Sequence, residues 1–249
     1  MITSSPYSAI ATIYDGMMEH VDYAAWADYI ERIFAFHHKH VSTICELACG
    51  TGSLAIELAR KGFVLHCSDL SPDMVRLATE KQIKAGVLID FSVHDMSTFS
   101  SEQPFDVVIC LYDSLNYLLD TDALRKFFRN AEKLVVCGGL LIFDICTEHN
   151  SLKHFENRYE FDRTYKYRRK SYYLPTQRLQ VNEVSVTQRG NIVREKHEQR
   201  IYRITEVAEI VEESPFETLG IYEDLGFQPG TEASERVHFV LEKPMGPMT

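Results

Sequence analysis

The sequence lacks the features of several other classes of protein. No apolar run approaches the roughly 18 residues of a membrane-spanning helix, and the first residues carry no signal-peptide pattern. The six cysteines never occur as Cys-x-x-Cys, and the ten histidines show no spacing typical of metal ligands. We therefore expect a cytoplasmic protein with buried free thiols, no bound metal and no membrane partner.

The composition is that of an ordinary folded chain with an excess of acid. The 249 residues are 45% hydrophobic and 25% charged, and the formal net charge is −10. This length predicts one large domain with room for an insertion. The acidic balance disfavours a broad surface for binding nucleic-acid phosphates.

A turn with two glycines is the most informative local feature. Glu46 ends an apolar run, Gly50 and Gly52 follow it, and a helical pattern begins at Ser53. Glycines let the backbone turn tightly and approach a ligand, and the first N–H groups of the helix point at whatever binds. Asp69 ends the next strand-like run, 23 residues after Glu46, where nucleotide-binding βαβ units hold the ribose. The pattern predicts a site for a nucleoside cofactor.

The third glycine of a dinucleotide-binding fingerprint is absent, since Ser53, Leu54 and Ala55 follow the second one. A carboxylate at Glu46 would also repel a pyrophosphate but attract an ammonium group. Both features argue against NAD and favour S-adenosylmethionine (SAM), which carries a sulfonium and an amino group. Here the sequence resembles the class I SAM-dependent methyltransferases, whose first motif is an acidic residue followed by two closely spaced glycines.

The resemblance continues in order over about residues 40–150. It implies that Asp69 binds the ribose, that Met74 covers the adenine and that Asp95 meets the adenine amino group. The residues expected to bind SAM and its product S-adenosylhomocysteine are Tyr14, Glu46, Ala48, Gly50, Gly52, Asp69, Leu70, Met74, Asp95, Met96 and Leu111.

Strand-like and helix-like segments alternate along the chain, as in a doubly wound parallel sheet. The predicted strands are 43–48, 64–68, 87–93, 106–111, 140–145, 218–223 and 236–242, and the predicted helices are 8–19, 23–38, 53–61, 72–85, 122–136 and 204–213. The resemblance implies a Rossmann-like α/β fold whose seven-stranded sheet has an antiparallel last strand. We expect four parts, namely an N-terminal helical lid over 1–40, a SAM-binding core over 41–150, an inserted antiparallel β-sheet over 151–203 and the completion of the core over 204–249.

The insert differs in charge from the rest of the chain. Strand-like alternation covers 165–174, 179–188 and 192–202, with a hairpin turn at 189–191. Residues 155–203 contain 12 Lys or Arg, 6 Asp or Glu and eight aromatic residues. This basic surface could protect exposed strand edges, form a homodimer contact, bind an anionic small-molecule substrate or bind RNA.

The segment after the fourth strand indicates the kind of acceptor. It contains no Asn/Asp-Pro-Pro-Tyr motif, which disfavours the exocyclic amines of nucleic-acid bases. Residues 113–118 instead resemble a branch of small-molecule amine methyltransferases that includes amino-sugar and glycine N-methyltransferases. In that branch an N-terminal Tyr-Asp pair, here Tyr14 and Asp15, folds over the cofactor. We expect a mobile lid that orders over bound cofactor.

The catalytic candidates are residues that could orient an amine and accept its proton, namely Tyr14, Asp113, Asn116, Tyr117 and His197. Strand alternation places His197 and Gln199 on one face and Glu198 and Arg200 on the other, and we favour the His197 face. Structural alternatives remain, since Tyr117 could be a core residue and His197 a surface residue. His149, after the fifth strand, ranks below His197.

The sequence therefore predicts a SAM-dependent methyltransferase that acts on a small molecule, at an amine nitrogen. Three alternatives stay open at this point. They are an RNA methyltransferase that uses the basic aromatic insert, a small-molecule O-methyltransferase, and a non-catalytic partner protein with this fold. The last is disfavoured because the chain keeps Gly50, Gly52 and Asp69.

Overall fold

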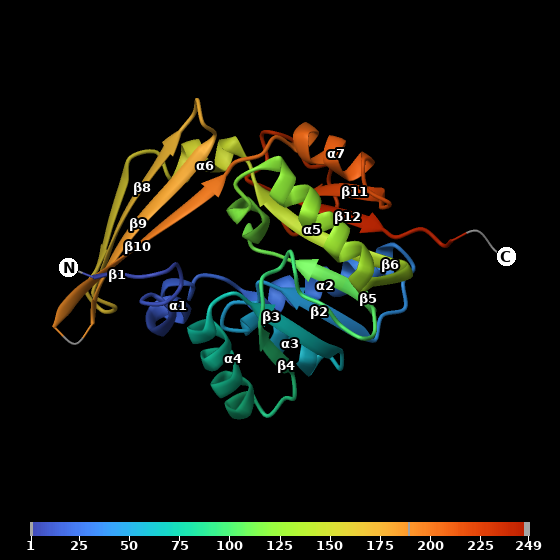
Figure 1. Ribbon diagram of the computed structural model, residues 1–249, viewed down its shortest axis with the longest axis horizontal. Coiled ribbons are helices and arrows are strands. Elements are labelled where there is room, and N and C mark those ends of the chain that lie inside the picture. Colours follow the sequence, from blue (N-terminus) through green and yellow to red (C-terminus); the bar gives the residue numbers. More distant parts are fainter. Residues whose placement is uncertain (1, 189, 247–249) are drawn as a thin grey trace.

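The computed structural model describes residues 2–188 and 190–246, which form two β-sheets and their covering helices (Figure 1). The larger sheet has the order β11-β12-β6-β5-β2-β3-β4, and the smaller sheet has the order β1-β10-β9-β8-β7. The larger sheet consists of β2 Thr43–Leu47, β3 Val64–Asp69, β4 Asp90–Val93, β5 Phe105–Cys110, β6 Val135–Cys146, β11 Glu217–Glu223 and β12 Arg236–Glu242. The smaller sheet consists of β1 Ile2–Thr3, β7 Arg158–Asp162, β8 Tyr167–Leu174, β9 Leu179–Gln188 and β10 Asn191–Arg200. The helices are α1 Ala11–Met17, α2 Tyr23–Phe36, α3 Ser53–Arg60, α4 Pro72–Ala85, α5 Thr121–Leu134, α6 Glu148–His154, α7 Ile204–Glu212 and the short 3-10 helix η1 Ser114–Tyr117.

The larger sheet confirms the expected fold class. Strand β2 pairs in parallel with β3 and β5, and β5 pairs in parallel with β6. Strand β12 is antiparallel to both of its neighbours, β6 and β11. The sheet is therefore the doubly wound one with an antiparallel last strand that the resemblance implied.

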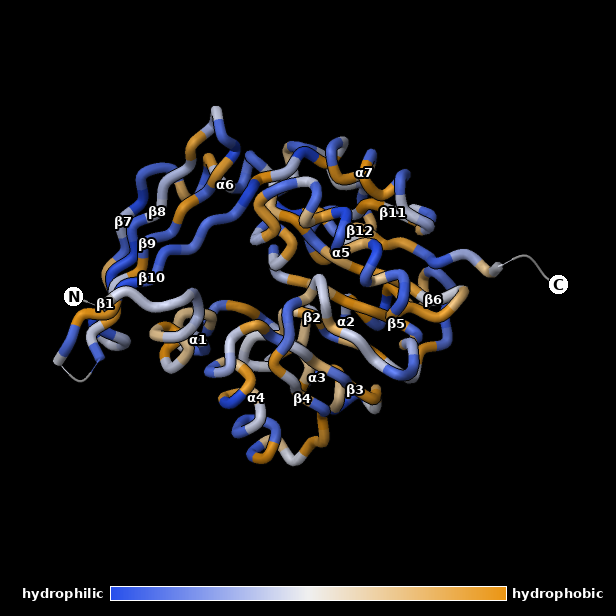
Figure 2. Tube along the Cα trace, viewed as in Figure 1, coloured by the Kyte–Doolittle hydropathy of each residue, from blue (hydrophilic) through white to orange (hydrophobic). Residues whose placement is uncertain are grey.

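Apolar helix faces cover both sides of this sheet. On one side Phe127 and Phe128 of α5 pack with Val108 of β5. On the other side Ile30 of α2 packs with Ile109 of β5. Figure 2 shows the same division, because hydrophobic residues concentrate in the central strands while β7 to β10 are largely hydrophilic. The hydrophobic core thus lies around the larger sheet, whereas the strands of the smaller sheet carry mostly polar residues.

Capping residues define α4 as the sequence predicted. The Ser71 hydroxyl accepts a hydrogen bond from the Met74 N–H at 3.3 Å, and Pro72 occupies the first turn. Gly86 ends the helix with φ +69°, a conformation that glycine adopts without strain. These local signals are strong enough to fix both ends of the helix.

Several elements differ from the sequence-based prediction. Strands β1 and β7 and helix α6 were not expected, and α1 begins at Ala11 instead of residue 8. Strand β7 lies at a sheet edge and leaves Tyr159 and Phe161 exposed, so its hydrophobic pattern does not mark a buried face. The predicted turn at 189–191 includes Arg189, which lies outside the described residues, and Asn191 already belongs to β10.

Two expectations about composition can be compared with the structure. All six cysteines are free, and five of them are buried as expected, whereas Cys137 is exposed. No helix among the described residues is both long and apolar enough to span a bilayer.

Candidate functional site

A large cavity lies where the carboxyl ends of the core strands face the smaller sheet. Its volume is about 1210 Å³, and it is lined by the strand ends of the core, the inner face of β8 to β10 and the N-terminal segment, here residues 4–20. Single-ligand pockets usually measure roughly 300–1,000 Å³. This cavity is therefore large enough for a nucleoside cofactor together with a second small molecule.

The glycine-containing turn forms one wall of the cavity. Ala48, Gly50 and Gly52 all have positive φ, at +57°, +56° and +71°. The Gly50 N–H donates a 2.8 Å hydrogen bond to the Asp69 carboxylate, which fixes the turn against the end of β3. A Cβ at Gly50 would meet only the Tyr14 ring at 3.8 Å, so this backbone is open to a ligand.

Gly52 has a different role from the one expected. It does not line the cavity, and a Cβ there would lie 2.7 Å from the Phe91 ring. The residue is the N-cap of α3, and its missing side chain lets the turn approach Phe91 of β4 and Ala78 of α4 closely. Gly52 therefore shapes the turn through its conformation and lies outside the lining of the cavity.

Two buried carboxylates face the cavity. Glu46 is 5% exposed, and its Oε2 has no hydrogen-bond partner. Burial and the neighbouring Asp69 raise the pKa of Glu46 to about 8. Burial also raises the pKa of Asp69, although the N–H groups of Ser71 and Gly50 oppose that shift. An unpartnered carboxylate at this depth fits an ammonium group, as the sequence predicted for the methionine end of SAM.

Apolar residues also line the cavity on the side of the core strands. Met74 is buried, whereas Leu70 at the rim is 68% exposed, which is unusual for a leucine. Asp95 lies beside them, with one oxygen accepting the Ser97 N–H at 2.7 Å. This arrangement fits a flat heteroaromatic base with an amino group. The predicted cofactor residues that line the cavity are Tyr14, Glu46, Ala48, Gly50, Asp69, Leu70, Met74, Asp95, Met96 and Leu111.

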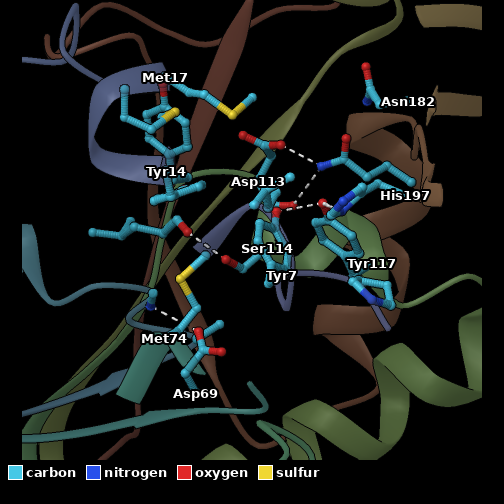
Figure 3. A pocket seen from close by; sticks show the side chains of 18 of the residues that line it. Tyr7, Tyr14, Met17, Asp69, Met74, Asp113, Ser114, Tyr117, Asn182 and His197 are labelled. Carbon is cyan, nitrogen blue, oxygen red and sulfur yellow. Dashed lines mark hydrogen bonds between the residues drawn. The ribbon is translucent and has the colours of Figure 1, made fainter. Parts of the chain in front are cut away.

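A chain of hydrogen bonds crosses from the N-terminal segment to the smaller sheet (Figure 3). The Tyr7 and Tyr117 hydroxyls lie 2.5 Å apart, and the Tyr117 hydroxyl lies 3.1 Å from His197 Nδ1. His197 Nε2 lies 3.1 Å from Glu195 Oε2. Burial raises the pKa of both tyrosines, so both hydroxyls stay neutral near pH 7.

The Glu195 carboxylate determines which group donates each hydrogen bond of this chain. Burial opposes ionisation of Glu195, but hydrogen bonds from His197 and from the Ala9 and Ile10 amides lower its pKa. An ionised carboxylate only accepts, so His197 Nε2 donates to it and Nδ1 is left as an acceptor. Tyr117 then donates to His197, and Tyr7 donates to Tyr117.

Asp113 belongs to a buried ionic cluster. It follows Tyr112, and both residues have positive φ, at +53° and +61°. Arg236 donates to Asp113 at 2.7 Å and also pairs with Asp144, which is fully buried. The guanidinium packs over the rings of Tyr112 and Trp26. Burial raises the pKa of both aspartates, and Arg236 opposes this.

The structure corrects the expectation for Asn116. Its side chain is fully buried and does not line the cavity. Its Nδ2 donates to the Arg200 carbonyl at 2.7 Å, and its Oδ1 accepts from the Cys146 N–H at 3.1 Å. Asn116 joins η1 to β6 and β10, and both ends of its amide are already bonded to the backbone. The other catalytic candidates, Tyr14, Asp113, Tyr117 and His197, line the cavity.

The sequence-based candidates do not include Tyr7, Glu195, Asp144 or Arg236. Glu195 lies two residues before His197 on β10, so the period-2 alternation that selected His197 could have found it. Asp144 and Arg236 meet Asp113 from distant parts of the chain, and no local pattern marks them. His149 lies exposed on α6 and outside the cavity.

Acidic residues outnumber basic ones around the cavity. The lining acids are Glu46, Asp69, Asp95, Asp113, Glu160, Asp224 and Glu235, and the lining guanidiniums are Arg158, Arg169 and Arg236. The cavity therefore favours a positively charged ligand. Within residues 2–188 and 190–246, no group of three or more His, Cys, Asp or Glu side chains is arranged to hold a metal ion.

The sheet topology and this cavity define a protein that binds a nucleoside cofactor with a cationic amino-acid end. Residues 44–139 match the family model described as a methyltransferase domain. A protein of Geobacillus sp. (strain WCH70) that is named a methyltransferase is 30% identical over 245 residues, 95% of this chain and 99% of that protein. The chain thus belongs to the SAM-dependent methyltransferases, and SAM is its cofactor.

Solved structures agree with this family. A SAM-dependent methyltransferase from Clostridium acetobutylicum ATCC 824 is 25% identical, with a TM-score of 0.82 over 96% of this chain and 99% of that one. A SAM-bound amino pentose methyltransferase from Micromonospora echinaspora is 18% identical, with a TM-score of 0.71 over 93% of this chain and 96% of that one. The second comparison shows a shared fold alone.

Proposed function

We propose that the protein transfers the methyl group of SAM to an amine nitrogen of a small, polar acceptor. The observation that carries this proposal is the chain Tyr7–Tyr117–His197–Glu195, which runs from a cavity rich in acid to a buried carboxylate. When bound, SAM supplies a methyl carbon activated by a sulfonium. The residues of the chain then need to position the acceptor, exclude water and take up a proton.

The charges around the cavity support an amine. An aliphatic amine is mostly protonated at neutral pH. The raised pKa of Glu46 leaves it mostly neutral at pH 7, but the six other lining acids still outnumber the three guanidiniums, so the lining attracts such a cation. Of the Lys and Arg residues on β7 to β10, only Arg158 and Arg169 line the cavity, and Arg169 pairs with Glu160. We therefore do not favour the anionic acceptor or the RNA that the basic insert first indicated.

The hydrogen-bonded chain offers a route for the proton. As a proton leaves the acceptor nitrogen for the Tyr7 oxygen, the Tyr7 proton moves to Tyr117 and the Tyr117 proton moves to His197 Nδ1. The resulting imidazolium stays paired with Glu195, so the transferred charge is balanced. Proton transfer from an aliphatic ammonium to an imidazole is uphill by only roughly 4 pKa units. The same transfer from an unactivated alcohol is far more costly, which favours N- over O-methylation.

The inner face of the smaller sheet supports a hydroxylated acceptor. Asn182 of β9 points into the cavity (Figure 3), with its Oδ1 accepting from Ser171 at 2.6 Å. The buried amides of Gln180 and Gln199 bond each other at 3.1 Å beside it. Such fixed polar groups suit an acceptor with several hydroxyls, for which amino sugars are the model class.

A paired substrate panel tests the proposal. Purified protein is incubated with SAM, with primary amines on hydroxylated rings, and with the same compounds in which a hydroxyl replaces the amine. We expect mass spectrometry to show one added methyl on amines only. His197→Gln should lower turnover by about 10²-fold or more, whereas His149→Gln, outside the cavity, should not. Methylation of the hydroxyl analogues, or of RNA in a parallel sample, would refute the amine assignment.

The homodimer through the smaller sheet remains a separate proposal. Its support is the exposed pair Tyr159 and Phe161 on the edge strand β7. Light scattering should report a dimer that Phe161→Lys disrupts, and a monomer in both samples would refute it.

A further inference from the structure

One carboxylate joins the N-terminal segment to the catalytic histidine. Glu195 Oε2 accepts from the Tyr7 N–H at 2.8 Å and from His197 Nε2 at 3.1 Å. Glu195 Oε1 accepts from the Ile10 N–H at 3.2 Å and also from the Ala9 N–H. The Glu195 side chain is only 1% exposed, so every donor that satisfies it comes from the protein.

We infer that Glu195 is a positioning residue that makes His197 competent only when the N-terminal segment is seated over the cavity. The inference rests on the proposed role of His197 as a proton acceptor. It adds that the seating of the segment and the Nε2–H tautomer of His197 occur together, because both depend on hydrogen bonds to the Glu195 carboxylate.

The burial of Glu195 explains the coupling. The three amides come from Tyr7, Ala9 and Ile10, and the Ser4 hydroxyl donates to Glu195 Oε1 at 3.3 Å. Departure of the segment would therefore remove four donors at once and admit water to the carboxylate. The Tyr7 hydroxyl, the outer member of the proton route, would leave with them. An open segment therefore leaves His197 with a hydrated partner and with no link to the acceptor.

The contacts of Glu195 with the amides of Tyr7, Ala9 and Ile10 are called the latch below. Tyr7 also connects this latch to the side of the cavity where the predicted cofactor residues lie. Its carbonyl accepts from the Ser71 hydroxyl at 2.9 Å, and the Ser71 N–H donates to Asp69 at 2.8 Å. Tyr7 itself has φ +61°, a conformation that a tyrosine keeps only when its surroundings hold it. The main chain of Tyr7 thus bridges the predicted ribose-binding residue and the positioning residue of the acceptor half.

Substitution of Glu195 by glutamine tests the latch in the full-length protein. A glutamine amide would present N–H groups to the donors of the segment, so Glu195→Gln should unseat it. Glu198→Gln, on the opposite face of the same strand, is the matched control. Both variants are measured with S-adenosylhomocysteine and without any acceptor, by hydrogen exchange of residues 4–10 and by ¹⁵N NMR of the His197 ring.

We expect exchange of residues 4–10 to become at least roughly tenfold faster in Glu195→Gln and to stay within about twofold in Glu198→Gln. The wild-type ring should carry its proton on Nε2, and Glu195→Gln should lose that preference. Tyr7→Phe keeps the backbone amide, so the segment should stay seated. If Glu195→Gln does not fold, Glu195→Asp, which is one methylene too short to reach all its donors, provides the same two measurements.

The possible outcomes separate this inference from the proposed function. Unchanged exchange and an unchanged Nε2–H signal in a folded Glu195 variant would overturn the latch, even if amines are methylated. A change in both signals without any methylated amine would support the latch and refute the amine acceptor. Faster exchange with an unchanged ring tautomer would reduce Glu195 to an anchor of the segment and overturn the coupling.

Discussion

The unpartnered carboxylate of Glu46 makes a quantitative prediction about cofactor binding. Burial and Asp69 raise the pKa of Glu46 to about 8 in the ligand-free protein. At pH 7 the group is then about 90% protonated. An ammonium group of the ligand would bind the ionised form. Binding of S-adenosylhomocysteine at pH 7 should therefore release about 0.9 proton for each ligand bound.

Calorimetry in buffers of different ionisation enthalpy measures this proton directly. The observed heat should depend on the buffer, with a slope that gives the protons released. Affinity should rise by up to about tenfold per pH unit between about pH 5.5 and 7.5, because ionising Glu46 costs less as the pH approaches its pKa. Adenosine lacks the amino-acid end and should bind without this release.

The matched variants are Glu46→Gln and Glu57→Gln, the latter on the surface of α3. Glu46→Gln should abolish the buffer dependence, and Glu57→Gln should preserve it. The same group lowers the stability of the ligand-free protein as the pH rises from about 4.3 to about 8, since the unfolded chain loses the proton first. The free energy of unfolding should fall by up to about 1.4 kcal/mol per pH unit relative to Glu46→Gln. Identical heats in all buffers for the wild type would refute the pairing of Glu46 with an ammonium group.

Three further predictions follow from other parts of the site. Asp69→Ala should weaken S-adenosylhomocysteine binding by about 1.5–3 kcal/mol, because the ribose hydroxyls lose a charged acceptor, and unchanged affinity in calorimetry would remove Asp69 from the cofactor site. Deleting residues 1–20 should abolish turnover and weaken cofactor binding while the core stays folded. In the full chain, hydrogen exchange of the amides of this segment should be slower when S-adenosylhomocysteine is bound than in its absence. Equal protection with and without the ligand would make the segment a fixed part of the fold. Arg236→Met should cost about 3–5 kcal/mol in denaturant unfolding, because the fully buried Asp144 loses its ion-pair partner and Asp113 loses one of its donors, and a loss as small as that of the exposed Arg60→Met would contradict this.

The cofactor half of the site could be predicted because its signals are local. The turn from Glu46 to Gly52 and the acid at Asp69 lie within one βαβ unit, where backbone conformation and ligand contact depend on the same few residues. The apolar alternation of the core strands and the caps of α4 are local in the same way. Each of these features therefore appears in the sequence as a short pattern.

The acceptor half could not be predicted to the same depth because its residues meet across long separations. Asp113 and Arg236 lie 123 residues apart in the sequence, and Tyr7 meets Tyr117 and Glu195 from the N-terminus. The expectation for Asn116 was wrong for a related reason. A side-chain amide that bonds two distant backbone groups has the same sequence pattern as one that faces a substrate.

The pairing of β1 with β10 has a consequence for how acceptor specificity could be exchanged between relatives. Strand β1 is a parallel edge strand of the smaller sheet, although it precedes the whole core in sequence. The part of the chain that forms the smaller-sheet side of the cavity is therefore assembled from two separate pieces, residues 2–10 and 155–203. In a chimera that takes only residues 155–203 from a relative, the residue at position 195 would come from the relative, whereas the N-terminal segment that binds it would not. Grafting both pieces together keeps the contact between the Glu195 equivalent and the N-terminal segment intact. The SAM-binding core then needs no change.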